Sequence, residues 1–170
     1  IPSPVIKNLR NLALPTYNHR YFVDGTPTVQ DAYFAKGGTG SKSWQTVLVG
    51  GLNRGGQGIY ALDITSPDDI TSNGDADNLL HWEFTDTEDA DLGYTYSRPA
   101  VVRMHNGDWV AVFGNGYNNT EADGSVSSTG NAALYFVEMG TGDLIRKITL
   151  PAGMAQDPTA ANRPNGLATP

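Results

Sequence analysis

Short apolar runs alternate with glycine-rich and polar turns along most of the chain, which is the pattern of β-strands. The run that begins at Leu80 shows it most clearly, because apolar side chains at positions 80, 82 and 84 alternate with polar ones at 81 and 83. Such alternation is typical of a strand with one buried face. The pattern predicts eight strands, at 28–34, 44–51, 58–64, 80–84, 100–104, 109–116, 133–139 and 144–148.

The eight strands fall into two units with the same internal order. Each unit opens at a proline, and Pro27, Pro99 and Pro170 are 72 and 71 residues apart. A proline fits at the first position of a strand, where its missing N–H breaks no ladder hydrogen bond. In the second unit Asn106-Gly107 predicts a tight hairpin between the first two strands. Four strands per unit, joined by short turns, are the blade of a β-propeller.

This repeat predicts how the chain is organised. The predicted segments are a leader at 1–20, a first blade at 21–96 with an insertion at 66–79, a second blade at 97–150 with an insertion at 115–131, and a linker into the next blade at 151–170. A blade needs roughly 40–50 residues, so each unit is longer than a blade, and the insertions account for much of the excess. Long insertions of this kind often carry function. A propeller closes with several blades, so two blades need the rest of their own chain or another copy.

Two short helical segments are expected outside the strands. Ile6, Leu9 and Leu12 follow helical spacing in the leader. Ser66 followed by Pro67 is typical of a helical turn with a serine cap, inside the first insertion. Proline-containing coil at both ends suggests a piece of a longer protein.

Composition and charge exclude several classes of function. The net charge of −7 and the pI near 4.7 argue against binding of nucleic acid or anionic membranes, which needs clustered Lys and Arg. The absence of cysteine excludes disulfides, thiolate zinc sites and cysteine nucleophiles. No apolar run reaches the roughly 18 residues of a membrane span, so we expect no membrane insertion by this segment.

The candidate metal ligands lie in the first insertion. Asn73, Asp75 and Asp77 place oxygen-bearing side chains at alternate positions, as calcium loops do. The glycine of this stretch comes too early for such a loop, so an acidic, solvated insertion is the competing interpretation. The acidic run at 86–91 leaves the same two alternatives open, a hard-cation site or a charged surface turn.

No catalytic residues are predicted. His19, His81 and His105 are too far apart in sequence for a zinc or acid–base pair, and no Gly-x-Ser-x-Gly elbow occurs. The three tryptophans fall on predicted strands, which favours a role as packing anchors of the blades over a carbohydrate platform; they are Trp44, Trp82 and Trp109. Binding residues are not assignable from these patterns.

Several motifs resemble known propeller repeats. The strand 58–63 (Gly-Ile-Tyr-Ala-Leu-Asp) and the turn at 140–144 (Gly-Thr-Gly-Asp-Leu) resemble quinoprotein-type repeats. A longer ordered set resembles the C-terminal propeller of the PilY family of type IV pilus assembly and adhesion factors; it comprises His19 to Pro27, Gly55 to Asp63, Leu92 to Pro99, Phe113 to Asn118 and Gly130 to Tyr135. The expected fold is therefore all-β, a quinoprotein-like β-propeller fragment with about two four-stranded antiparallel blades.

The resemblance implies a non-enzymatic factor for type IV pilus biogenesis and surface adhesion, exported to the cell surface, the outer membrane or the pilus tip. Its implied partners are pilus subunits such as minor pilins, host or abiotic surfaces, and the rest of its own propeller. It implies a calcium-regulated parent domain whose aspartate-rich loop lies beyond Pro170, so calcium is not expected in this fragment. Arg54-Gly55-Gly56 is the nearest string to the integrin-type Arg-Gly-Asp motif of some members, and it lacks the acid.

Two other functions stay open at this point. A propeller fragment of a quinone-dependent dehydrogenase is one, although the vicinal cysteine pair of many such enzymes is absent. The other is a generic protein-binding scaffold of the outer membrane, which the Tyr-Ala-Leu-Asp repeat permits.

Overall fold

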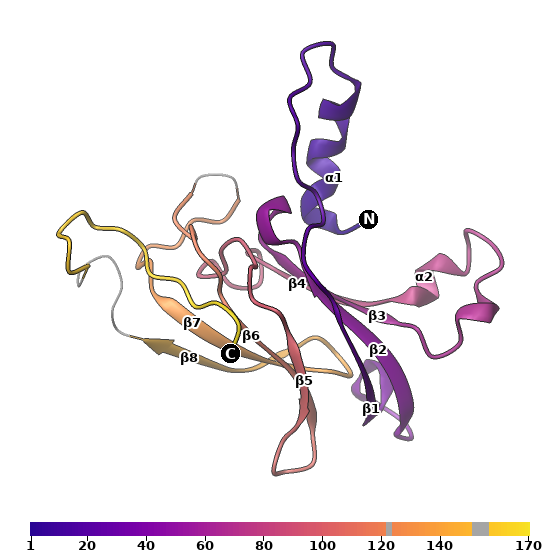
Figure 1. Ribbon diagram of the computed structural model, residues 1–170. Coiled ribbons are helices and arrows are strands. Elements are labelled where there is room, and N and C mark those ends of the chain that lie inside the picture. Colours follow the sequence, from indigo (N-terminus) through magenta and orange to yellow (C-terminus); the bar gives the residue numbers. More distant parts are fainter. Residues whose placement is uncertain (122–123, 151–156) are drawn as a thin grey trace.

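The computed structural model describes residues 1–121, 124–150 and 157–170. Two four-stranded antiparallel sheets lie next to each other, with strand orders β1-β2-β3-β4 and β5-β6-β7-β8 (Figure 1). The first contains β1 (Thr28–Phe34), β2 (Ser43–Gly51), β3 (Gly58–Asp63) and β4 (Leu80–Thr85). The second contains β5 (Ala100–Arg103), β6 (Trp109–Gly114), β7 (Ala132–Glu138) and β8 (Leu144–Leu150). The prediction of two antiparallel blades is confirmed.

The eight predicted strands agree with the observed ones to within one or two residues. The largest difference is the end of β6, which was expected at residue 116 and lies at Gly114. Just beyond it, the Asn115 side chain donates hydrogen bonds to the carbonyls of Asp91 and Asn131, at 2.9 and 3.0 Å. The Asn115 side-chain Oδ1 accepts the backbone N–H of Ala133 at 3.1 Å, while the Asn115 carbonyl accepts the N–H of Gly93, so the regular ladder with β7 ends there.

The hydrophobic core lies between the two sheets. Three aromatic rings form its centre, with centroids 5.4 to 5.7 Å apart; they belong to Phe84, Phe113 and Tyr135. Around them pack apolar side chains of both sheets, among them Val47, Val49, Ile59, Ala61, Val101, Ala111, Val137 and Met139. Offset and edge-on contacts between aromatic rings stabilise such a core beyond the burial of area alone.

Two tyrosines at equivalent places have different surroundings. In β3, Asp63 pairs with Val47 of β2, and Tyr60 lies three residues before Asp63. In β7, Glu138 pairs with Val110 of β6, and Tyr135 lies three residues before Glu138. Tyr135 is fully buried between the sheets, whereas Tyr60 lies on the opposite, outward face of the first sheet and is half-buried. The two sheets therefore stack in the same orientation, as successive blades do, and the outward face of the first is equivalent to the buried face of the second.

The sequence repeat reappears as a repeat of contacts. Thr28 Oγ1 donates to the carbonyl of Pro99 at 2.7 Å, and the backbone N–H of Arg98 donates to Thr169 Oγ1 at 3.1 Å. Both pairs are 71 residues apart. The start of the second unit thus contacts the start of the first unit. The segment at Thr169 contacts the start of the second unit in a similar way.

An N-terminal arm (residues 1–22) projects from the first sheet, drawn in indigo in Figure 1. It contains α1 (Ser3–Leu9) and a 3-10 turn at Arg10–Ala13. The predicted helix forms, and its buried side chain is Val5, whereas Ile6 is more than half exposed. The helix contacts the sheet through its first turn, where the backbone N–H of Ser3 donates to Glu83 Oε1 at 2.9 Å.

The first insertion, between β3 and β4, contains a 3-10 turn at Pro67–Asp69 and the short helix α2 (Ala76–Leu79). The predicted helical turn is present, but the Ser66 side chain makes no capping hydrogen bond. Residues 122–123 of the second insertion and 151–156 of the predicted linker lie outside the described residues. In the part of the chain that is described, no helix has the length and apolar character to cross a membrane.

Candidate binding site at the base of the N-terminal arm

Of the three candidate calcium ligands, Asp75 is the one whose side chain makes hydrogen bonds within the first insertion. The Asp75 carboxylate accepts hydrogen bonds from the backbone N–H groups of Thr71 and Ser72, at 3.1 and 2.8 Å, and from both hydroxyls. These hydrogen bonds, first that of the Ser72 hydroxyl, hold the pKa of Asp75 below its usual value. Asn73 and Asp77 are exposed, and no group of three or more metal-ligating side chains occurs among the described residues.

The second acidic run binds a lysine. Lys147 Nζ on β8 lies 2.7 and 2.9 Å from the two carboxylate oxygens of Asp89 and 2.6 Å from Asp91 Oδ2. An ammonium group therefore occupies the position between the two carboxylates that a hard cation would need. Ser127 Oγ of the second insertion donates to Asp91 as well. This cluster connects the segment between the blades to β8 and to the second insertion.

Contacts within the cluster shift the pKa values of Asp91 and Tyr135. Partial burial by itself would raise the pKa of Asp91, but hydrogen bonds from Lys147 and Ser127 and the positive charge of Lys147 together lower it. The hydroxyl of Tyr135 donates to Asp89 Oδ1 at 3.1 Å, and burial, followed by the charge of Asp89, raises the pKa of Tyr135. The group is therefore a fixed ion cluster at neutral pH.

Two of the three tryptophans pack as predicted. Trp82 is buried, and its indole N–H donates to the carbonyl of Met139 in the other sheet at 3.1 Å. Trp109 packs against the core. The prediction was wrong for Trp44, whose side chain is 62% exposed at the end of the outward face, although its ring lies 6.1 Å from that of Trp109.

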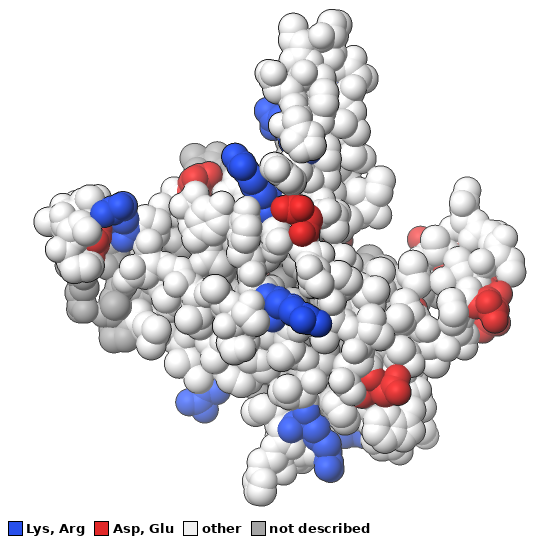
Figure 2. Space-filling view, viewed as in Figure 1, with Lys and Arg blue, Asp and Glu red and all other residues white. Residues whose placement is uncertain are grey.

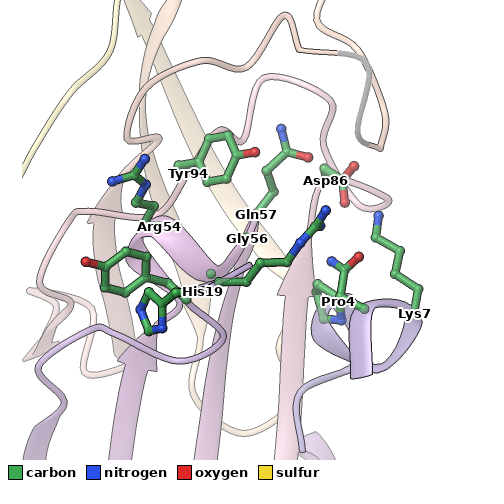
Figure 3. A pocket seen from close by; sticks show the side chains of 12 residues that line it. Pro4, Lys7, His19, Arg54, Gly56, Gln57, Asp86 and Tyr94 are labelled. Atoms are coloured by element: carbon green, nitrogen blue, oxygen red, sulfur yellow. The ribbon is translucent and has the colours of Figure 1, made fainter. Parts of the chain in front are cut away.

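A cavity of about 600 Å³ opens where the arm meets the loop between β2 and β3 (Figure 3). It is lined by Pro4, Lys7, Asn8, His19, Arg20, Tyr21, Arg54, Gly55, Gly56, Gln57, Asp86 and Tyr94. Three segments that are distant in sequence meet here: the arm, the β2–β3 loop and the segment between the two blades. A cavity of this volume is within the range of ligand sites in proteins.

The cavity is locally cationic although the chain as a whole is acidic. Among the described residues, Lys7, Arg20 and Arg54 line it together with His19, against one carboxylate, that of Asp86. In Figure 3 Lys7 points toward Asp86, on the opposite side from Arg54. Figure 2 shows blue side chains beside the arm and at its base. The balance of charge favours an anionic ligand.

Aromatic packing positions the Arg54 guanidinium. Its central carbon lies 5.4 Å from the centroid of the Tyr21 ring, and the His19 imidazole meets the same ring edge-on, with centroids 4.9 Å apart. A cation over an aromatic face is stabilised by the ring quadrupole, and the stacked guanidinium leaves its N–H groups available.

Two further features of the wall result from tight packing. A Cβ at Gly55 would overlap the carbonyl oxygen of Phe22, so only glycine lets the returning strand of the arm lie this close. Gln57 is 4% exposed, and its Nε2 has no hydrogen-bond partner among the described residues. A buried donor without a partner costs about 1–3 kcal/mol, which makes this amide a candidate ligand-binding group.

Comparison with known proteins identifies the family. A family model described as the PilY1 beta-propeller domain matches residues 2–170. The chain belongs to the PilY1 β-propeller family. The PilY resemblance seen in the sequence is thereby confirmed over nearly the whole chain.

Relatives and a solved structure agree with this assignment. A type IV pilus biogenesis factor PilY1 homolog of Xylella fastidiosa strain Temecula1 is 42% identical over 157 residues, covering 92% of this chain and 9% of that protein. The type IV pilus biogenesis factor PilY1 of Pseudomonas aeruginosa strain UCBPP-PA14 is 39% identical, covering 100% and 12%. The crystal structure of the P. aeruginosa PilY1 C-terminal domain matches with a TM-score of 0.69 and 36% identity, over 99% of this chain and 28% of that one. The chain thus spans about a tenth of the length of these curated PilY1 relatives.

Proposed function

We propose that this chain is a scaffold segment in the propeller of a type IV pilus biogenesis factor, and that it acts at the cell surface without catalysis of its own. The observation that carries the proposal is the match of the whole chain to PilY1 proteins described as type IV pilus biogenesis factors. It favours this function over a quinone-dependent dehydrogenase fragment and over a generic outer-membrane scaffold. Pilus subunits such as minor pilins, and host or abiotic surfaces, are its proposed partners.

The first partner we propose is the rest of the same propeller. The outward face of the first sheet presents Leu48, Tyr60 and Leu62, and Leu80 is about half exposed beside them. The equivalent face of the second sheet is buried against the first. The chain covers 28% of the solved PilY1 domain, so further blades of the same polypeptide are the proposed cover for this face.

Calcium regulation is proposed for the parent domain and not for this segment. The Asp75 carboxylate already accepts four hydrogen bonds, which supports a structural role for the insertion. Asn73, Asp75 and Asp77 stay the candidate ligands within this chain. Calcium titration of the parent protein, with and without Asp75→Asn, tests this: we expect the same calcium affinity for both, and a loss of calcium binding in the variant would assign the ion to this insertion.

The proposed function is tested in cells by complementing a deletion of the parent gene. Trp82→Ala removes the buried contact between the blades, and we expect loss of surface pili and of twitching motility. Lys42→Ala, at an exposed surface lysine, is the matched control and restores both. Normal piliation in cells that lack the parent protein altogether would contradict a role in pilus biogenesis.

A further inference from the structure

We propose that the cavity at the base of the arm binds a carboxylate-bearing segment of an acidic protein partner. The inference rests on the chemistry of the cavity and is independent of the role in pilus biogenesis. The cavity combines positive side chains, two tyrosines, two glycines without side chains at positions 55 and 56, and a buried amide.

Two of the three positive side chains of the wall, Arg20 and Arg54, form no ion pair among the described residues. The ion pairs of the described residues involve Lys36, Lys42, Lys147 and Arg163, and neither Arg20 nor Arg54 takes part in one. The guanidinium of Arg54 is positioned by Tyr21. A guanidinium presents a planar fork of donors that matches a carboxylate in a two-point contact, so the wall is prepared for this group.

The negative charge of Asp86 favours a singly charged anionic ligand over a more highly charged one. Its carboxylate lines the same cavity and accepts a hydrogen bond from the backbone N–H of Ser125, which fixes it there. A phosphate dianion would be repelled by this carboxylate more strongly than a singly charged carboxylate ligand. A long polyanion such as nucleic acid would in addition meet the overall charge of −7.

The remaining wall fits a peptide better than a free small anion. Tyr21, Tyr94 and Pro4 offer apolar surface for the body of a segment, and Gly55 and Gly56 add no side chains that would fill the cavity. The unpartnered Nε2 of the buried Gln57 supplies a donor for a carboxylate or a peptide carbonyl. Binding would satisfy this amide, and a satisfied buried hydrogen bond contributes specificity because an unmatched ligand leaves the donor unpaired.

The test uses the complete parent protein and a fluorescently labelled tetraglutamate peptide, with anisotropy measured at low ionic strength. We expect saturable binding that weakens about tenfold, or about 1.4 kcal/mol, in the double variant Arg20→Gln with Arg54→Gln. Arg10→Gln, at an exposed arginine of the same arm that does not line the cavity, is the matched control and leaves binding unchanged. A tetraglutamine peptide should not bind.

A second variant keeps the test independent of folding. Asp86→Asn removes the one carboxylate that lines the cavity among the described residues and should tighten tetraglutamate binding several-fold, a gain that a damaged fold does not produce. Unchanged binding in the double arginine variant would overturn the proposal, as would weaker binding in Asp86→Asn. Displacement of the peptide by inorganic phosphate at the concentration at which free glutamate displaces it would show a general anion site and also refute the proposal.

Discussion

Lys147 holds together two carboxylates that would otherwise repel each other, so replacing it tests the cluster that links the two blades. In Lys147→Met the aliphatic stem is kept and the charge is lost. Breaking a fully buried ion pair costs about 3–5 kcal/mol. The side chains here are 23% exposed for Lys147 and 16% for Asp89 and for Asp91, so solvent screening reduces the expected loss to about 2–3 kcal/mol. For a chain of this size the loss corresponds to a fall in melting temperature of about 5–10 °C.

The pH dependence gives the sharper measurement. Because the folded pKa of Asp91 is below its unfolded value of about 3.9, its stabilisation is complete well above that pH and is lost as the pH falls through the folded pKa. Without Lys147 the hydrogen bonds from Ser127 and Thr129 remain, but burial is no longer opposed by the ammonium group. The pKa of Asp91 should then rise from its folded value, and protonation relieves the unpaired charge. The cost of Lys147→Met should therefore be largest near pH 7 and shrink to roughly half near pH 4.

Urea unfolding followed by tryptophan fluorescence, repeated from pH 4 to pH 7, measures both effects. Lys42→Met is the matched control, because Lys42 Nζ lies 3.9 Å from Asp108 in an exposed pair and should contribute less than about 0.5 kcal/mol. A pH-independent cost for Lys147→Met, or a cost no larger than that of the control, would refute the structural role assigned to the cluster.

Three further predictions follow from the packing. Trp82→Ala should lower the free energy of unfolding, measured in urea, by about 3–5 kcal/mol, whereas Trp44→Ala at an exposed position should lower it by less than about 1 kcal/mol. Equal losses would contradict the assigned burial. Gly55→Ala should push the Phe22 strand away and speed amide hydrogen exchange in α1 by about tenfold, and unchanged exchange would argue against this close approach. Burial lowers the pKa of His81 despite its hydrogen-bonding contact with a backbone carbonyl, so the unfolded chain binds the proton more readily and stability falls as the pH drops below about 6.5. His81→Gln should flatten that slope, and a slope retained in the variant would exclude His81 as its source.

The residues of the candidate site could not be assigned from local sequence patterns. Arg54 and Gly55 were noted in the sequence as part of an incomplete adhesion motif, and Arg20, Gly55 and Gln57 lie within the motifs of the family resemblance, but nothing in the sequence marked them as binding residues. The cavity is made by three segments far apart in sequence, so no spacing rule marks it. The acidic run at 86–91 was recognised as charged, but its counter-ion, Lys147, comes from β8 at the other end of the second blade.

The sequence by itself determined the strands, the turns and the 71-residue repeat. Strand alternation, glycine and proline at turns and apolar runs are properties of neighbouring residues, and the repeat relates each unit to the next along the chain. Only the tertiary structure decided which face of each sheet is buried. Tyr60 and Tyr135 occupy equivalent places in their blades. They differ in burial because Tyr135 faces the neighbouring blade and Tyr60 lies on the outward face of the first sheet. Burial, ion pairing and the cationic cavity depend on contacts between distant segments, and these contacts exist only once the blades have packed.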